Sequence, residues 1–439
     1  ASLKKSEFLK ASYYFDRALS INPSNIDALT NKGCVFLETF EYDKALSFHD
    51  AALKLNPLHY SALINKGVLL HKLGRYIEAL DSFNSALEVN QDLPDAWLNR
   101  GVVWAEGFGD YQKALADYEK VIKLDPSNSD ARWNSALVYL VLKNFGLGWK
   151  YYESRWKKTN PDRYRYQEIK NLSDERSASL AGKRVLVWHE QGFGDTIQFC
   201  RYIANLSSLG VQVYLDVPES LKPLMQSLPG CRIVPQDRAL ITFDYQLPMM
   251  SLPGYFGVGS SISLVNNQYL FAPISKKLYW RDLLNLKSDK LNVGLCCSGN
   301  SELDQRTGNR RPIPLHFFEK LLPEINIYII QKSLVPNDLN FIRNHPEIRY
   351  LGDQIRDFAD SAAIIDCLDA VVSVDSALAH LAGALGKRSF VLLSKVADWR
   401  WFLDDDRSPW YSGMTLLRQQ EQGNWSTVIK ELKDRLFIN

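Results

Sequence analysis

The hydrophobic pattern of the chain changes its period after Trp156. Up to that residue, small and large apolar side chains recur at a fixed interval and predict antiparallel pairs of helices. Beyond Gly182, short β-branched runs alternate with stretches of helical pattern. Strands that alternate with helices form parallel sheets covered on both faces. The sequence therefore predicts a helical region followed by an α/β region.

The helical region is built from a repeat. Gly33, Gly67 and Gly101 lie 34 residues apart, and Ala136 continues the series after 35 because one residue is inserted near Gly107-Phe108-Gly109. Small residues at these positions let the two helices of a hairpin approach closely. The period resembles that of the tetratricopeptide repeat (TPR) family. We expect four hairpins and a leading helix within residues 1–158, stacked into a superhelix with a concave binding face.

The second part of the chain divides into two series of predicted strands. A polar linker is expected at residues 159–182, a first lobe at 183–288 and a second lobe with a C-terminal helix at 289–439. We expect two Rossmann-like lobes with ligands bound at the carboxyl ends of the strands, and a C-terminal helix that packs back across the first lobe. The predicted strands are Arg184–Glu190, Val211–Val217, Arg232–Pro235 and Asp244–Pro248, then Asn292–Cys297, Ile325–Lys332, Ile348–Gly352, Ala370–Asp375, Ser389–Ser394 and Thr415–Arg418.

Composition narrows the class of protein. The formal net charge of +2 lacks the basic excess of a nucleic-acid binder. The six cysteines include no C-x-x-C pair, which argues against a zinc site or a disulfide framework and is typical of a reducing compartment. The longest apolar stretch, Ala370 to Gly386, is interrupted by Asp375 and His380 and predicts a buried strand and helix instead of a membrane span. We expect a cytoplasmic protein.

The first candidate site follows the first predicted strand. Its sequence, from His189 through Gln191, Gly192 and Gly194 to Asp195, predicts a tight glycine turn that leads into a helix. Free backbone amides at such a helix start attract anions or hydroxyl oxygens. A dinucleotide fingerprint would need a third glycine where Ile197 stands, which argues against NAD or FAD. An aspartate at this position is also a common helix cap, so both interpretations of Asp195 stay open.

Two further candidate sites lie in the second lobe. Arginines follow the strand that ends near Cys297, in a loop suited to bind a diphosphate through guanidinium forks or, alternatively, simply exposed to solvent. After the strand that ends at Asp375, small residues begin a helix whose start favours a phosphate. His380, one turn on, is either a ligand contact or a packed core histidine. The candidate donor-binding residues of these loops are Ser298, Asn300, Arg306, Arg310, Arg311, Asp375, Ser376, Ala377 and His380.

These motifs together resemble glycosyltransferase family 9, the heptosyltransferase-like enzymes, in the form that carries N-terminal TPRs. The matching stretches are EQGFGDTIQFCRY, GLCCSGN with RRPIPL, SVDSALAHLAGALGK and DWRWFLDDDRSPWY. The resemblance implies a GT-B fold, a nucleotide-sugar on the second lobe, an acceptor on the first, and metal-independent transfer with inversion. It also implies that Asp195 is the general base, with His189 as the alternative, and that Gln331 and Lys332 contact the donor.

The TPRs separate this chain from the family's lipopolysaccharide enzymes. A TPR groove beside a glycosyltransferase predicts a polypeptide acceptor modified on Ser or Thr, such as flagellin or another surface protein. The helix start at Asp195 is expected to favour the ionised carboxylate, which makes it the weaker base. Two other functions remain open. One is a TPR scaffold with an inactive glycosyltransferase-like domain, and the other is a GT-B sugar-nucleotide epimerase. The donor base, the sugar and the oligomeric state are not predicted.

Overall fold

The chain folds into two compact units, Ala1–Val138 and Tyr139–Asn439. The computed structural model describes residues 2–158, 165–174, 180–235, 241–259, 268–286, 289–299 and 311–438. The first unit is helical and the second combines helices with two parallel sheets. The predicted order, a helical region followed by an α/β region, is confirmed. Among the described residues, no helix is both long enough and apolar enough to cross a membrane.

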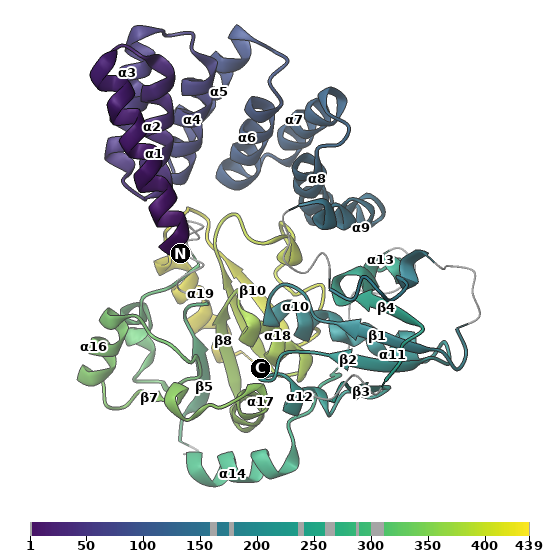
Figure 1. Cartoon of the computed structure of the whole chain (residues 1–439). Coiled ribbons are helices and arrows are strands. Elements are labelled where there is room, and N and C mark those ends of the chain that lie inside the picture. The colour runs from purple at the N-terminus through teal and green to yellow at the C-terminus, as the bar shows by residue number, and fades with distance from the viewer. Residues whose placement is uncertain are drawn as a thin grey trace. The chain divides into compact units, whose positions relative to one another are not determined.

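A leading helix and paired helices make up the first unit (Figure 1). The leading helix is α1 (Ser2–Ile21), as predicted. The pairs that follow are α2 (Ile26–Glu38) with α3 (Tyr42–Leu55), α4 (Tyr60–Lys72) with α5 (Tyr76–Val89), and α6 (Pro94–Val102) with α7 (Tyr111–Leu124). The fourth predicted hairpin is α8 (Ser129–Val141) with α9 (Phe145–Tyr152).

The repeated glycines exist because an aromatic ring of the second helix lies against each of them. A Cβ atom on Gly67 would lie only 2.7 Å from the ring of Phe83 on α5, closer than real side chains approach. The rings of His49 and Tyr118 occupy the equivalent places opposite Gly33 and Gly101. The 34-residue interval therefore records one glycine-to-ring contact per hairpin.

The inserted residue is absorbed in a π-helical turn. Residues Val103–Phe108 continue α6 as the π-helix η1, and Gly109 ends it with a φ of 67°. A π-helix takes one more residue per hydrogen-bonded turn than an α-helix and usually arises from a single insertion. The residue inserted near Gly107 thus produces a local bulge, and the glycine-to-ring contact between Gly101 and Tyr118 is kept.

Helix α9 belongs to the second unit, although its sequence continues the repeats. The indole Nε1 of Trp149 donates to the carbonyl of Val258, 2.9 Å away, and the ring packs edge-on against Phe199 and Trp399. These contacts bind the helix to a part of the chain far ahead in sequence. The boundary between the compact units therefore falls inside α8, earlier than the predicted end of the repeats at residue 158.

The first sheet has four parallel strands in the order β3-β2-β1-β4. They are β1 (Arg184–Trp188), β2 (Gln212–Asp216), β3 (Cys231–Ile233) and β4 (Tyr245–Pro248). Helices α10 (Phe193–Phe199), α11 (Ile203–Ser207), α12 (Lys222–Met225) and α13 (Leu252–Phe256) belong to this lobe. In the described part of the predicted linker, Tyr166 packs with Leu186 and Trp188, so this segment covers the first sheet.

The second sheet has six parallel strands in the order β10-β9-β8-β5-β6-β7. They are β5 (Leu291–Cys296), β6 (Ile325–Ile329), β7 (Arg349–Tyr350), β8 (Ala370–Val374), β9 (Ser389–Leu393) and β10 (Met414–Arg418). Helices α16 (Pro336–Asn344), α17 (Phe358–Cys367) and α18 (Ala377–Ala384) connect them. The ten predicted strands are therefore confirmed, and each sheet reverses its strand order at its first strand, β1 or β5.

The C-terminal helix corrects one expectation. Helix α19 (Ser426–Leu436) packs on the second lobe and not across the first. Its apolar side chains Val428, Leu432 and Leu436 are buried in the same core as Val293 and Ile327 of the second sheet. A helix with a continuous apolar stripe of this kind packs where that stripe is covered, and here the second sheet covers it.

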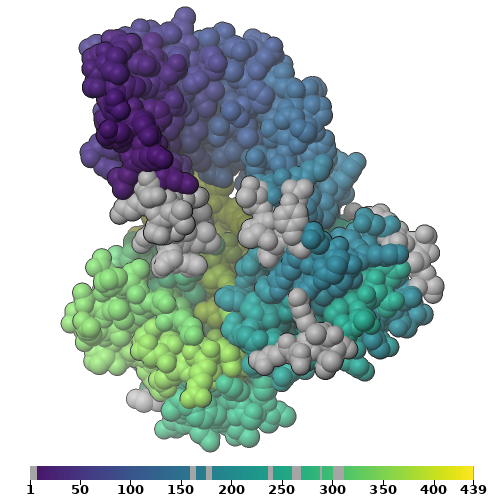
Figure 2. Space-filling model, in the orientation of Figure 1, coloured from purple at the N-terminus to yellow at the C-terminus, as the bar shows by residue number. Residues whose placement is uncertain are grey.

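Helix α14 (Ile274–Leu284) precedes the second lobe in the chain and packs on α17. Its Trp280 is fully buried and donates from Nε1 to Asp360, 2.9 Å away, and Lys276 pairs with the same carboxylate. The other side of the helix is exposed at Ile274 and Leu278. The helix itself lies at the lower edge of the surface in Figure 2.

Candidate functional site

The candidate site forms where helices α10 and α18 cross. A Cβ atom on Gly194 would lie 3.0 Å from the His380 ring and 3.4 Å from Cα of Ala377, so the two helices touch at the glycine (Figure 1). The strand order reverses at β1 in the first sheet and at β5 in the second. Helix α10 follows β1, and α18 follows β8, the neighbour of β5. Reversal points are where open α/β sheets bind ligands. The crossing therefore brings together the glycine motif and the motif around Asp375.

Asp195 stands at the third position of α10. Its Oδ2 accepts a hydrogen bond from the backbone amide of Gly192, 2.8 Å away, so the carboxylate closes the start of the helix. This confirms that Asp195 caps the helix, and a capping role does not exclude a chemical one. The side chain is also mostly buried, at 17% exposure.

Arg400 is the second partner of Asp195. It lies in the short helix η10 (Trp399–Trp401) of the second lobe, and its Nη2 contacts Oδ1 of Asp195. Its Nη1 lies 2.8 Å from Asp398, and its Nε donates to Oε1 of Gln198 at 2.9 Å. The guanidinium stacks on the Trp399 ring at 4.3 Å. One buried arginine thus holds the candidate base from across the two lobes.

The environment of Asp195 corrects the expected direction of its pKa. Burial raises the pKa of Asp195 above its ordinary value, because removal from water penalises the charged form. Arg400 and the Gly192 amide act in the opposite direction without cancelling that effect. The sequence predicted a lowered pKa from the helix start alone. Asp195 is consequently a stronger base than the sequence implied.

Asp375 directly follows strand β8 and faces the same arginines. Burial, followed by the nearby charge of Asp398, raises the pKa of Asp375 to about 6, against the opposing effect of Arg311 and Arg400. The Nη1 of Arg311 donates to the backbone carbonyl of Asp375 at 3.3 Å and lies 3.8 Å from its Oδ2. Asp195, Asp375 and Asp398 thus form a set of carboxylates balanced by two guanidinium groups.

Ser376 caps the helix that begins at Ala377. Its Oγ accepts from the amide of Ala379 at 3.4 Å and lies 2.9 Å from Oγ of Ser373. The hydroxyl is therefore turned toward the helix start, where α18 presents its first backbone amides. A helix of this kind favours negative charge at that end.

Gln331 has a positioning role in this structure. Its buried Oε1 accepts from the amides of Cys297 and Ser298, at 2.7 and 3.2 Å, and its Nε2 donates to Oγ of Ser298 at 2.7 Å. The side chain fixes the loop after β5. Lys332, the next residue, is exposed.

His380 is a packed core histidine, the alternative that the sequence left open. It is 4% exposed, stacks on Trp401 with ring centres 5.2 Å apart, and lies 3.0 Å from the hydroxyl of Tyr411. Burial, then Arg400 and Arg201, hold its pKa well below the ordinary value, so the ring is neutral. The structure places it between α10 and α18.

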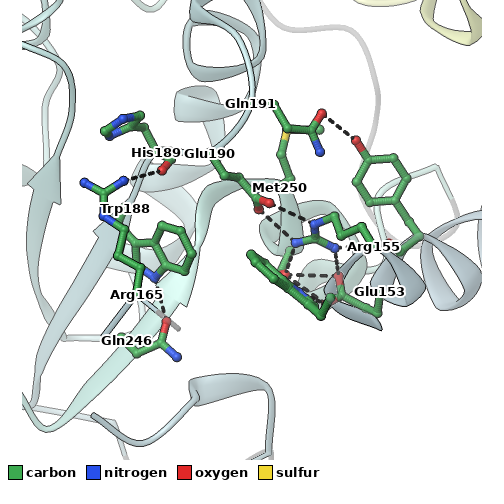
Figure 3. Close-up of polar contacts among 12 residues, drawn as sticks. Glu153, Arg155, Arg165, Trp188, His189, Glu190, Gln191, Gln246 and Met250 are labelled. Atoms are coloured by element: carbon green, nitrogen blue, oxygen red, sulfur yellow. Dashed lines mark hydrogen bonds and ion pairs between the residues drawn. The ribbon is translucent and has the colours of Figure 1, made fainter. Parts of the chain in front are cut away.

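His189 points away from the helix crossing. Its Nδ1 lies 3.2 Å from the carbonyl of Asp216 at the end of β2. The backbone carbonyl of His189 accepts a hydrogen bond from Arg165. In Figure 3 its imidazole lies on the opposite side of the loop from Gln191. The structure therefore brings Asp195 to the crossing with α18, and not the alternative base His189. The predicted donor residues Asn300, Arg306 and Arg310 lie outside the described residues.

Three further residues hold the loop after β1 or the helix α10 that follows it, and the sequence did not single them out. Tyr152 and Arg155, from α9 and the following η2 (Glu153–Lys157), contact Gln191 and Glu190 (Figure 3). Arg400 was part of a stretch quoted for the family resemblance but was given no role. Spacing offers no signal for such residues, because each of them finds its partner only after the chain has folded.

Comparison with known proteins agrees with this organisation. Residues 60–93 match the tetratricopeptide repeat and residues 109–142 match a TPR repeat. Residues 356–401 match glycosyltransferase family 9 (heptosyltransferase). The chain is a TPR-repeat protein with a region similar to family 9 glycosyltransferases. The family 9 match contains Asp375, Ser376, Asp398 and Arg400. It does not include Asp195 of the first lobe.

A relative and several solved structures are also similar to the chain. Protein FlbA of Caulobacter vibrioides is 24% identical over 349 residues, which cover 73% of this chain and 58% of FlbA. The crystal structure of MamA is 21% identical with a TM-score of 0.31, covering 35% of this chain and 90% of MamA. The structure of PilF from Pseudomonas aeruginosa is 21% identical with a TM-score of 0.33, covering 36% of this chain and 72% of PilF.

Proposed function

We propose that the second unit transfers a sugar from a nucleotide-sugar to an acceptor hydroxyl, with inversion and without a metal ion. The contact of Gly194 with Ala377 and His380 carries this proposal. It brings a buried carboxylate, Asp195, which is paired with Arg400, to the start of α18, where Arg311 contacts Asp375. A base and a cationic environment for a leaving group are the two requirements of such a transfer.

In the proposed reaction, the acceptor oxygen attacks the anomeric carbon as the bond from that carbon to the diphosphate oxygen breaks. The hydroxyl proton passes to Asp195. The carboxylate oxygens of Asp195 contact Arg400 and the Gly192 amide, and a carboxylate has further lone pairs that can take the proton. Its raised pKa makes it a stronger base than an ordinary aspartate.

The leaving diphosphate needs positive charge on the other side of the sugar. Arg311 and the first amides of α18, beside Ser376, supply it. Preorganised charge of this kind is usually the largest contribution to catalysis. We assign to Asp375, which follows β8, the acceptance of hydrogen bonds from hydroxyl groups of the donor. His380 and Gln331 support this region from inside the fold.

We propose a polypeptide acceptor modified on Ser or Thr, such as flagellin or another surface protein. The repeats support this part of the proposal, because TPR hairpins form concave surfaces that hold partner chains. The similarity to FlbA supports the same combination of regions but specifies no reaction.

The test begins with thermal shifts on a panel of nucleotide-sugars, since a ligand that binds only the folded state raises the melting temperature. The stabilising donor, labelled in the sugar, is then incubated with candidate acceptor proteins. We expect transfer that is lost in Asp195→Ala while donor stabilisation survives. Normal turnover by that variant would rule out the assigned base. Binding without transfer or hydrolysis would indicate a scaffold, and an isomerised donor without acceptor would indicate an epimerase.

A further inference from the structure

Helix α9 and the turn that follows it are fixed against the loop after β1. Trp149 anchors the helix through its bond to Val258 and its ring contacts with Phe199 and Trp399. One turn later, Tyr152 is also buried and packs edge-on against Trp149. The last helix of the repeat sequence therefore has a defined position relative to the loop that leads to Asp195.

A buried ion pair fixes the loop at Glu190. Arg155 donates from Nε to Oε2 and from Nη2 to Oε1 of Glu190, at 2.9 and 2.8 Å (Figure 3). Both side chains are nearly inaccessible, at 4% and 1% exposure. The Oε1 of Glu190 also accepts from the amide of Met250 at the end of β4. A bidentate ion pair of this kind has little conformational freedom. It therefore fixes the position of the backbone at the next residue, Gln191.

Gln191 has an uncommon backbone conformation and an exposed side chain. Its φ is 61°, in the left-handed region that residues other than glycine rarely adopt. Such conformations persist where surrounding contacts impose them, and they gather at functional sites. Its Oε1 accepts a hydrogen bond from the hydroxyl of Tyr152, 3.2 Å away. The side chain is exposed, and with Oε1 engaged its amide keeps two N–H donors on Nε2.

The side-chain amide of Gln191 lies in the loop that leads to the candidate base. Gln191 directly precedes Gly192, whose amide binds the carboxylate of Asp195. An acceptor hydroxyl that reaches Asp195 therefore lies near this loop. The Nε2 group offers donors only, and its natural complement is an oxygen without a proton. In a polypeptide acceptor, the backbone carbonyl next to the reacting Ser or Thr is such an oxygen.

We propose that Gln191 binds a backbone carbonyl of the polypeptide acceptor through Nε2, and that Tyr152 is the positioning residue that holds the amide in this orientation. The inference rests on the proposed glycosyltransferase activity. It gives α9 a direct part in acceptor recognition, since the hydroxyl that orients Gln191 comes from the last helix of the repeats.

The test is a double-mutant cycle in the full chain with Tyr152→Phe, Gln191→Ala and the two combined. Each single change removes the oriented donor, so the acceptor KM is expected to rise about fivefold, as one neutral hydrogen bond implies. The double variant should be no worse than either single one, because both changes remove the same interaction. The rate of donor hydrolysis and the increase in melting temperature caused by the donor should stay unchanged.

Gln191→Glu separates a binding role from a structural one. The carboxylate of this variant still accepts from Tyr152 but has no N–H to donate. We therefore expect Gln191→Glu to have the same raised KM as Gln191→Ala. Tyr151→Phe, one residue away on α9, is the matched control and should behave as the wild type. A wild-type KM in Gln191→Glu, or additive effects in the cycle, would overturn the inference alone. A wild-type chain that transfers no sugar to any polypeptide would overturn the proposed function with it.

Discussion

Arg400 of the second lobe is ion-paired with Asp195 of the first. Because the same guanidinium also holds Asp398 and Gln198, the pair is fixed on both sides. Charge and position of the candidate base are thus set by a residue that is 205 positions away in the sequence. The first lobe supplies the carboxylate, and the second lobe contributes to its orientation and opposes the rise in its pKa that burial causes.

Replacement of Arg400 by lysine should move the pH dependence of transfer. Lysine keeps the charge but not the fork, so one of the two carboxylates loses its partner. The pKa of Asp195 then rises further, since Arg400 opposes the effect of burial. We expect the acidic limb of the pH–rate profile to shift to higher pH, with a loss of about 10- to 100-fold in kcat near neutral pH. An unchanged acidic limb would contradict this account. Arg407→Lys, at an exposed position of the same segment, is the control.

Asp375→Asn should stabilise the protein at neutral pH and not in acid. The pKa of Asp375 is raised to about 6 in the folded chain, above its value when unfolded. The folded state therefore binds the proton more tightly, and stability falls as pH rises from about 4 to 6. Above pH 6 the variant should gain about 1–3 kcal/mol in free energy of unfolding, at roughly 1.4 kcal/mol per pKa unit. Urea unfolding at pH 4 and pH 8 measures the difference, which should vanish at the lower pH. Donor binding should weaken in the same variant.

Gln331→Ala should destabilise the second lobe without removing a ligand contact. The change leaves the amides of Cys297 and Ser298 without their buried acceptor. Each unsatisfied buried donor costs about 1–3 kcal/mol, so the two amides together predict a loss of about 2–6 kcal/mol in the free energy of unfolding, measured with urea. Donor affinity of the folded fraction should change less than in Asp375→Asn. A large loss of affinity at unchanged stability would instead favour direct contact between Gln331 and the donor.

His49→Phe should stabilise the first unit, most of all below pH 6. His49 stands where the other repeats have Phe83 and Tyr118, and neither ring nitrogen has a hydrogen-bond partner among the described residues. Burial lowers its pKa to about 4. The neutral ring is compatible with the fold above pH 6.5, and stability is lost as pH falls from 6.5 toward 4, because the unfolded chain takes the proton first. Phenylalanine removes that dependence and adds about 1–3 kcal/mol by removing unpaired polar atoms. Thermal unfolding of the two forms at pH 5 and pH 8 tests this, with the part-exposed His71→Phe for comparison.

The elements of the fold could be predicted because their signals are local. The interval between Gly33 and Gly67 reports a contact made once per hairpin, and each β-branched run reports its own burial in a sheet. The destination of α19 could not be predicted in this way. Its apolar stripe requires a cover, but the stripe does not say which lobe provides it.

The candidate site was predictable in its motifs and not in its pairs. The glycine turn and the helix start at Ser376 are fixed by short stretches of sequence. The partners Arg400 for Asp195 and Arg155 for Glu190 meet only through tertiary structure. Burial, another tertiary effect, also reversed the expected direction of the pKa of Asp195.

The π-helical turn at Val103–Phe108 has a consequence for how the repeats tolerate change. An extra residue in an ordinary helix would rotate everything after it by about 100° and turn the ring contacts outward. Here the surplus is confined to one widened turn, and Tyr118 still finds Gly101. The insertion in one hairpin therefore does not shift the register of the glycine-to-ring contacts in the others. A deletion within the turn should leave a regular 34-residue array, which makes this the place where the chain can change length without changing what the neighbouring hairpins present.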